Sequence, residues 1–103
     1  MYDVVMSDLR FDWDERKNRA NQQKHGVAFE EAESVFADEN ALLISDPEHS
    51  EAEDRFILLG LSSTLRVLLV FHCYRAGGDV IRIISARKAL QGEREQYARR
   101  WSR

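Results

Sequence analysis

Three apolar segments in the second half of the chain are joined by links too short to contain a crossover helix. The segments, rich in Leu, Val, Ile and Phe, are Phe56–Leu61, Val67–Tyr74 and Val80–Ser85, and the links are Ser62-Ser63-Thr64 and Ala76-Gly77-Gly78-Asp79. Parallel strands need a connection of about a dozen residues or more, whereas antiparallel strands need only a hairpin. The sequence therefore predicts an antiparallel meander, to which the short apolar run Ala41–Ser45 adds a fourth strand.

Two helices are predicted before this meander. The first runs from Trp13 to about Lys24, with Asp12 as N-cap and Gly26 as a left-handed stop. It is unusually polar, and only Trp13 and Ala20 are expected to face a core. The second runs from Phe29 to Ala37, where apolar residues recur at helical spacing.

The end of the chain again follows a helical pattern, from Arg87 to Trp101, with Leu90, Tyr97 and Trp101 on one stripe. A short strand is expected before the first helix. The predicted class is therefore α+β, with an antiparallel sheet of four to five strands, two N-terminal helices and a C-terminal helix.

Length and composition indicate one domain spanning residues 1–103. No apolar run approaches the roughly 20 residues that cross a bilayer, and the N-terminus lacks the features of a signal peptide. Cys73 is the only cysteine, so an internal disulfide is impossible. We expect a cytoplasmic protein that has no membrane contact.

Charge is distributed unevenly along the chain. Residues 1–54 hold 15 acidic and 5 basic side chains, a balance of −10, and residues 55–103 hold 3 and 10, a balance of +7. Such asymmetry permits a basic surface beside an acidic one. It is equally compatible with two halves that interleave in space and partly cancel.

One face of the first predicted helix carries Lys17, Asn21 and Lys24, which can hold a phosphate and its neighbours. The alternative is an ordinary solvated helix face. His25 follows at the helix end, where histidine can exchange a proton near neutral pH or simply complement the helix dipole.

A second basic group surrounds the last predicted strand. Arg82 lies within it, Arg87 follows it, and Arg75 ends the preceding strand. Guanidinium groups on a rigid support suit bidentate recognition of phosphate. The competing interpretations are an ion pair with Glu93 or an edge arginine for Arg82, and a solvated turn residue for Arg75.

Glu93 and Tyr97 lie four residues apart on the terminal helix. The carboxylate suits a general base or a clamp on an arginine, and the phenol suits a proton donor, a phosphate contact or a core aromatic. His49 is expected to be solvated, and His72 is expected to be a core or edge residue. The three histidines lack metal-ligand spacing, so we expect neither a metal nor a cofactor.

Taken together, these residues resemble the BrnT toxin family. The resemblance rests on Trp13-Asp14-Glu15-x-Lys17, Asn21-x-x-Lys24-His25-Gly26-Val27-x-Phe29, Ile83-Ile84-Ser85-Ala86-Arg87-x-Ala89, and Glu93-Arg94 with Tyr97. It implies a RelE-like fold and the toxin of a type II toxin–antitoxin pair, which cleaves RNA and thereby stops translation. It also implies a BrnA-like antitoxin with a ribbon-helix-helix part, through which the complex reaches operator DNA.

RelE-like enzymes need no metal, which leaves the chemistry to side chains. Our hypothesis assigns phosphate stabilisation to Arg82 and Arg87 with support from Lys24, the base to His25 or Glu93, and the acid to Tyr97 or His25. Lys17, Asn21 and Arg75 would hold flanking RNA. Two alternatives stay open: an RNA- or antitoxin-binding module without catalysis, and a subunit whose acidic loop 46–54 docks a basic segment.

Overall fold

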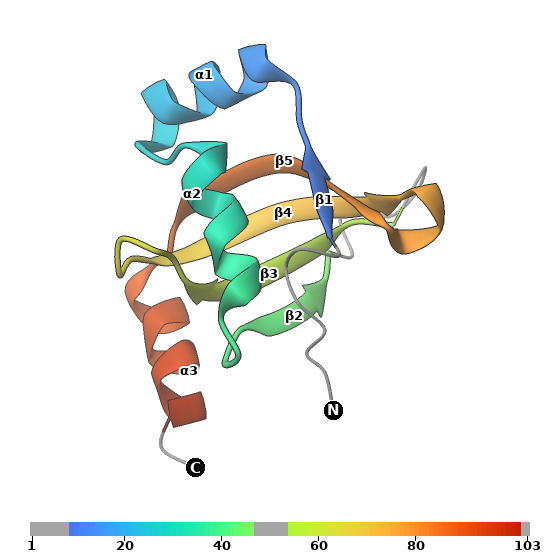
Figure 1. Ribbon diagram of the computed structural model, residues 1–103. Coiled ribbons are helices and arrows are strands. Elements are labelled where there is room, and N and C mark those ends of the chain that lie inside the picture. Colours follow the sequence, from blue (N-terminus) through green and yellow to red (C-terminus); the bar gives the residue numbers. More distant parts are fainter. Residues whose placement is uncertain (1–8, 47–53, 102–103) are drawn as a thin grey trace.

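A computed structural model describes residues 9–46 and 54–101 of the chain and contains one five-stranded sheet with three α-helices (Figure 1). Residues 47–53, most of the predicted acidic loop, lie outside the described part. The elements, in chain order, are β1 (Arg10–Asp12), α1 (Glu15–His25), α2 (Phe29–Ser34), the 3-10 turn η2 (Val35–Ala37), β2 (Leu42–Ser45), β3 (Phe56–Leu61), β4 (Val67–Arg75), the 3-10 turn η4 (Ala76–Gly78), β5 (Val80–Lys88) and α3 (Gln91–Trp101).

The meander from β2 to β5 is antiparallel throughout, as predicted. The strand order is β1-β5-β4-β3-β2, and β1 joins the outer edge of β5 in parallel. The sheet is therefore mixed, and the prediction of a wholly antiparallel sheet is wrong for β1. Phe71 and His72 are consecutive on β4 but face Ser85 and Ile83 on β5, which leaves Ile84 as the extra residue of a bulge.

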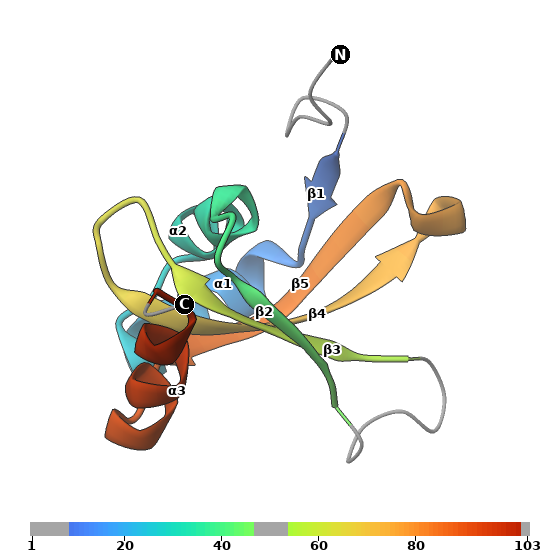
Figure 2. The same cartoon turned by 90° about the horizontal axis from the view of Figure 1, so that it is seen from below.

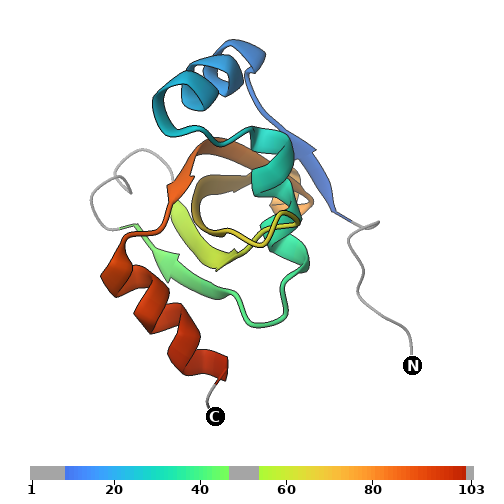
Figure 3. The same cartoon turned by 90° about the vertical axis from the view of Figure 1, so that its left-hand side faces the viewer.

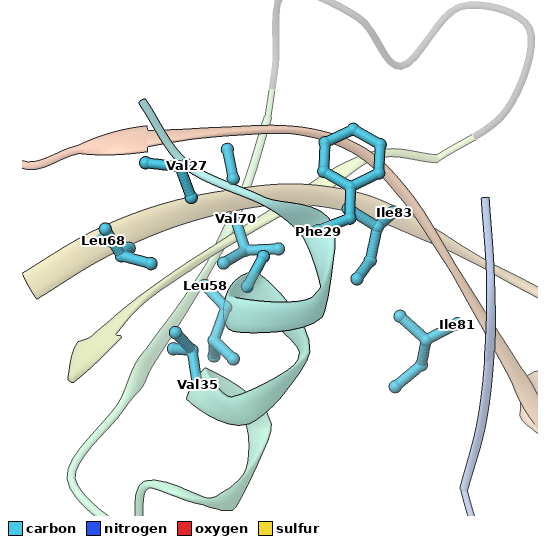
Figure 4. Packing of buried hydrophobic residues seen from close by; sticks show 10 residues of the cluster. Val27, Phe29, Val35, Leu58, Leu68, Val70, Ile81 and Ile83 are labelled. Carbon is cyan, nitrogen blue, oxygen red and sulfur yellow. The ribbon is translucent and has the colours of Figure 1, made fainter. Parts of the chain in front are cut away.

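Helices cover the two faces of the sheet unequally. The α2 helix packs on one face over a core of ten buried residues that includes Val27, Phe29 and Val35 (Figure 4). The α3 helix packs on the other face, where Tyr97 meets Leu59 and Ala89. Figures 2 and 3 show α2 and α3 on opposite sides of the strands. Alternation along the strands separates the two cores, since successive side chains point to opposite faces.

The first helix attaches to the fold by polar contacts. Its buried side chains are Asn18 and Asn21, whereas Ala20 is exposed, contrary to prediction. The Asn18 amide oxygen accepts a hydrogen bond from the Phe29 backbone N–H at 2.8 Å. The N-cap is Asp14 rather than Asp12, since the Asp14 carboxylate accepts bonds from the first turn. Asp12 belongs to β1 instead.

The helix stops where the sequence predicts, at Gly26, whose φ of 71° lies in the left-handed region. The terminal helix begins later than predicted. Arg87 and Lys88 continue β5, and α3 starts at Gln91. Tyr97 is buried, in agreement with the core-aromatic alternative, whereas Leu90 and Trp101 from the same predicted stripe are 65% and 59% exposed and do not belong to the core.

Candidate functional site

The carboxyl end of β5 presents two adjacent cations to opposite faces of the sheet. Arg87 pairs in register with Leu69, whose side chain belongs to the core under α3. Lys88 pairs with Leu68, which belongs to the core under α2. The strand end is thus basic on both sides, and Lys88 is a cation that the sequence prediction did not select.

Arg87 is held as a rigid fork. Its Nη1 and Nη2 atoms donate to the two Glu93 carboxylate oxygens at 2.9 and 3.0 Å. The guanidinium carbon lies 5.9 Å from the centre of the Phe71 ring. Both side chains keep some solvent access, with 30% of Arg87 and 28% of Glu93 exposed. Paired bonds and an aromatic support fix the plane of the guanidinium, and Nη1 also donates to the Lys88 carbonyl at 3.2 Å.

Glu93 also caps the start of α3. Its Oε1 atom accepts the Leu90 backbone N–H at 2.8 Å, which caps the first turn of α3. The hydrogen bonds from Arg87, with that from Leu90, lower the pKa of the Glu93 carboxyl below its ordinary value despite partial burial. Glu93 is therefore a carboxylate at neutral pH and links the strand end to the helix start.

Asn21 ties the C-terminal part of α1 to this same strand end. Its amide nitrogen donates to the carbonyls of Ala86 and Val27, each at 2.8 Å, and its amide oxygen accepts the Ala86 N–H at 3.2 Å. The amide thereby satisfies the outer edge of β5 as a neighbouring strand would. With 6% of Asn21 exposed, these bonds occupy the side chain and give it a positioning role, while its contact with RNA stays a prediction.

Lys24 and His25 occupy the last turn of α1, one turn beyond Asn21. Lys24 is exposed and His25 is half-buried. The following carbonyl, that of Gly26, accepts a hydrogen bond from Arg66 at 3.0 Å. Within the described ranges, no hydrogen bond or ion pair joins Lys24 or His25 to Arg87. What brings them to the same end of the molecule is the bond between Asn21 and Ala86.

Arg66 and Glu31 form a network that the sequence analysis missed. Arg66 Nε donates to Glu31 at 3.0 Å, Nη2 makes a second contact with the same carboxylate, and Ser62 and Thr64 also donate to it. These hydrogen bonds, foremost that of Arg66, lower the pKa of Glu31 to about 2. The network joins the β3–β4 turn to α2 and to the end of α1. Its partners lie 35 residues apart, so no local motif could have indicated it.

Two further predicted cations lie on the same sheet face as Arg87. Arg82 faces Cys73 in register, and Arg75 faces Val80, which puts both on the α3 side. Arg82 Nη1 donates to Asp12 at 3.1 Å, so its carboxylate partner is Asp12 and not Glu93. This face therefore carries three arginines at different distances from α3.

Tyr97 does not share this environment. Its hydroxyl donates to Asp38 Oδ2 at 2.5 Å, and 4% of the residue is exposed. Burial, with the Asp38 carboxylate beside it, raises the pKa of Tyr97, which makes the phenol a weaker acid. The contact anchors α3 on the turn after η2, and it argues against the predicted role as proton donor.

The remaining predicted residues are placed simply. Lys17 is exposed on α1, and Trp13 packs edge-on against Phe29 with ring centres 5.9 Å apart. His72 is fully buried, as expected, with Nδ1 near the Val70 carbonyl and Nε2 near the Tyr74 hydroxyl. His49 lies outside the described residues.

Residues 9–46 and 54–101 contain no group of three or more His, Cys, Asp or Glu side chains that could hold a metal ion. Nor does any helix in these ranges combine the length and apolar character needed to cross a bilayer.

Comparisons with known proteins agree with the resemblance seen in the sequence. Residues 13–93 match the family model described as "Ribonuclease toxin, BrnT, of type II toxin-antitoxin system". The 1.1 Å crystal structure of the Brucella abortus ribonuclease toxin BrnT is similar to this chain, with a TM-score of 0.61 and 27% identity over 81% of this chain and 99% of that one. No curated protein matches closely enough to indicate a relationship. Because the family model spans most of its length, the chain belongs to the BrnT family of ribonuclease toxins of type II toxin–antitoxin systems.

Proposed function

We propose that this chain is a metal-independent endoribonuclease that cleaves RNA in the cytoplasm and so inhibits translation. The observation that carries the proposal is the Arg87 fork, held by Glu93 and supported by the Phe71 ring. A fixed guanidinium stabilises a phosphorane best when it needs no reorganisation as negative charge develops. The family's description as a ribonuclease toxin agrees with this use of the site.

The reaction would be attack of a ribose 2′-hydroxyl on its own phosphate. A base removes the hydroxyl proton, and an acid protonates the leaving 5′ oxygen. His25 is our first candidate for one of these two steps, as base or as acid, because it is half-buried at the end of α1 beside Lys24. Glu93 is the alternative base, and it would have to exchange its bonds to Arg87 for substrate. Tyr97 is the weakest candidate for the acid, since its hydroxyl already donates a hydrogen bond to Asp38.

The surrounding cations would hold the flanking strand. Lys24 and Lys88 are exposed near the α1 and β5 ends, and Lys17 lies two turns earlier on α1. On the α3 side, Arg82 and Arg75 extend the basic face along β5 and β4. Such a track binds the RNA backbone without reading its sequence.

Family membership implies an antitoxin partner. We propose that this partner is BrnA-like and carries a ribbon-helix-helix part. In that arrangement the toxin would reach operator DNA only through the antitoxin, and the joint complex would repress its own operon.

End-group analysis of cleaved RNA tests the proposed chemistry. The purified chain, in EDTA, is expected to leave a 2′,3′-cyclic phosphate and a 5′-hydroxyl, because the 2′-oxygen is the nucleophile. A matched oligonucleotide with a single 2′-deoxy sugar at the cut site should resist cleavage there. Cleavage that requires a divalent ion, or that proceeds at the deoxy position, contradicts the proposal.

A binding module without catalysis is the second candidate, and the exposed lysines Lys17 and Lys24 on α1 and Lys88 on β5 are the observation that favours it. Such a module would retain RNA on a filter at low salt and leave it intact. Intact RNA after prolonged incubation with folded, antitoxin-free chain would favour this candidate over the nuclease.

A further inference from the structure

The β2 strand forms one outer edge of the sheet. It pairs with β3 on one side, and no other strand of the described ranges pairs with it on the other. The Asp46 N–H donates to the Arg55 carbonyl at 2.9 Å, which marks that pair as hydrogen-bonded. Since such pairs alternate along an antiparallel ladder, the backbone groups of Leu43 and Ser45 point away from β3. They present donors and acceptors to an additional strand.

The side chains of β2 lack the charged groups that would prevent another strand from pairing with that edge. Leu43 and Ile44 are 50% and 37% exposed, and they point to opposite faces of the sheet. Natural edge strands are normally protected by short length, charge, proline or a bulge; β2 is four residues long but contains no charge, proline or bulge. The opposite edge differs, because three-residue β1 carries Arg10 and Asp12.

The charge around β2 indicates what kind of chain fits. From Asp38 to Asp54 the sequence contains seven acidic residues and no lysine or arginine; Glu48, Glu51 and Glu53 among them lie outside the described residues, and Asp46 is buried. Among the described residues, Glu39 and Asp54 are exposed on either side of the strand. A basic segment is attracted to such a flank, whereas a second copy of this chain would bring two acidic flanks together.

We propose that the β2 edge is where the antitoxin docks, through an extended segment that adds a strand beside Leu43 and Ser45. The segment would carry alternating apolar residues against Leu43 and Ile44 and flanking lysine or arginine. Main-chain bonds would supply affinity, and the apolar contacts would supply register. The inference relies on the antitoxin partner that the family implies and is independent of the proposed nuclease chemistry.

The test uses the full chain and the purified antitoxin encoded in the neighbouring reading frame, with binding measured by calorimetry. Leu43→Lys adds a repelling charge to the edge, and we expect it to weaken binding by about tenfold or more. The matched control is Leu65→Lys, which makes the same change at a side chain 77% exposed in the β3–β4 turn. The control should bind within about twofold of the unaltered chain.

Hydrogen exchange on the unaltered protein tests the same docking site without a substitution. The amide protons of Leu43 and Ser45 should exchange more slowly once antitoxin is bound. Equal affinities for the two variants, or unchanged exchange at both amides, overturns the proposal. A dimer of the chain alone that Leu43→Lys dissociates overturns the choice of occupant. RNA cleavage by both variants should equal that of the unaltered chain, because neither residue belongs to the proposed catalytic site. The binding result can therefore be read even if the chain proves not to cleave RNA.

Discussion

Single polar side chains hold this small domain together at places where a hydrophobic contact would be expected. Asn21 satisfies the open edge of β5 at Ala86, and Asn18 receives the first N–H of α2 from Phe29. Tyr97 joins α3 to Asp38, 59 residues away in sequence. Removal of either asparagine leaves a buried backbone group unsatisfied, which costs more than a hydrogen bond contributes on average.

Asn21→Ala should therefore lower the free energy of unfolding by about 2–3 kcal/mol, because it leaves the N–H and carbonyl of Ala86 without their hydrogen-bond partner. Urea denaturation measures this loss. Gln23→Ala is the matched control, since Gln23 is exposed on the same helix. Equal midpoints for both variants contradict the positioning role of Asn21.

Tyr97→Phe separates anchoring from catalysis. The change removes the bond to Asp38, and we expect a loss of about 1 kcal/mol in stability with RNA cleavage nearly unaltered. Asp38 keeps its bond from the Leu61 N–H at 2.8 Å. Cleavage slowed by about 100-fold at unchanged stability would instead make the Tyr97 hydroxyl a catalytic acid.

At the scale of elements, close packing between η2 and β3 depends on one glycine. A Cβ on Gly60 would lie 2.9 Å from Val35 Cγ1 and Ala41 Cβ, and 3.0 Å from Asp38 Oδ2. Overpacking of this kind costs about 1–3 kcal/mol, so Gly60→Ala should lower the thermal midpoint clearly. Gly92→Ala is the control: nothing lies within 4 Å of that Cβ, and alanine favours the helix. An unchanged thermal midpoint for Gly60→Ala would contradict this packing.

The sequence predicted the elements whose signals are local. Apolar runs marked β3, β4 and β5 with correct starts, and short links made them antiparallel. It could not predict that β1 pairs in parallel with β5, because three residues are too few to show an alternation of apolar and polar side chains. It also extended the last helix back to Arg87, since charge and spacing alone do not reveal that Arg87 and Lys88 pair with Leu69 and Leu68.

The candidate site was predicted less completely than the fold. Arg87 and Glu93 were selected, and the structure joins them directly. Asn21 was selected for a contact with RNA, because helical spacing places it beside Lys24; this spacing does not show that its amide bonds to Ala86. The Arg66–Glu31 network has no sequence signal at all, since turn residues with hydroxyls and charges are common at protein surfaces.

At the scale of the whole molecule, acid should weaken the fold in two steps. Burial lowers the pKa of His72 below its ordinary value of 6.5, so the unfolded chain binds a proton that the folded chain resists. Stability should therefore fall as the pH drops below about 6.5. Glu31 has a pKa of about 2 instead of 4.5, so its contribution is present above pH 4.5 and is lost between 4.5 and 2.

Urea titrations at pH 7.5, 5.5 and 3.5 measure both steps. We expect stability to decrease from the first to the second pH and again to the third. His72→Gln should remove most of the first decrease and leave the second. Stability that is constant from pH 7.5 to 5.5 in the unaltered chain contradicts the burial of a neutral His72.

The catalytic role of the β5 end is tested most directly by the rate at which Arg87→Ala cleaves RNA in EDTA, free of antitoxin. The control is Arg99→Ala, an exposed arginine on α3. Loss of the Arg87 guanidinium, which we propose stabilises the phosphate, should slow cleavage by about 100-fold or more, while Arg99→Ala cleaves normally and both variants unfold cooperatively. Cleavage by folded Arg87→Ala at the rate of the unaltered chain would contradict the claim that the end of β5 is the catalytic centre.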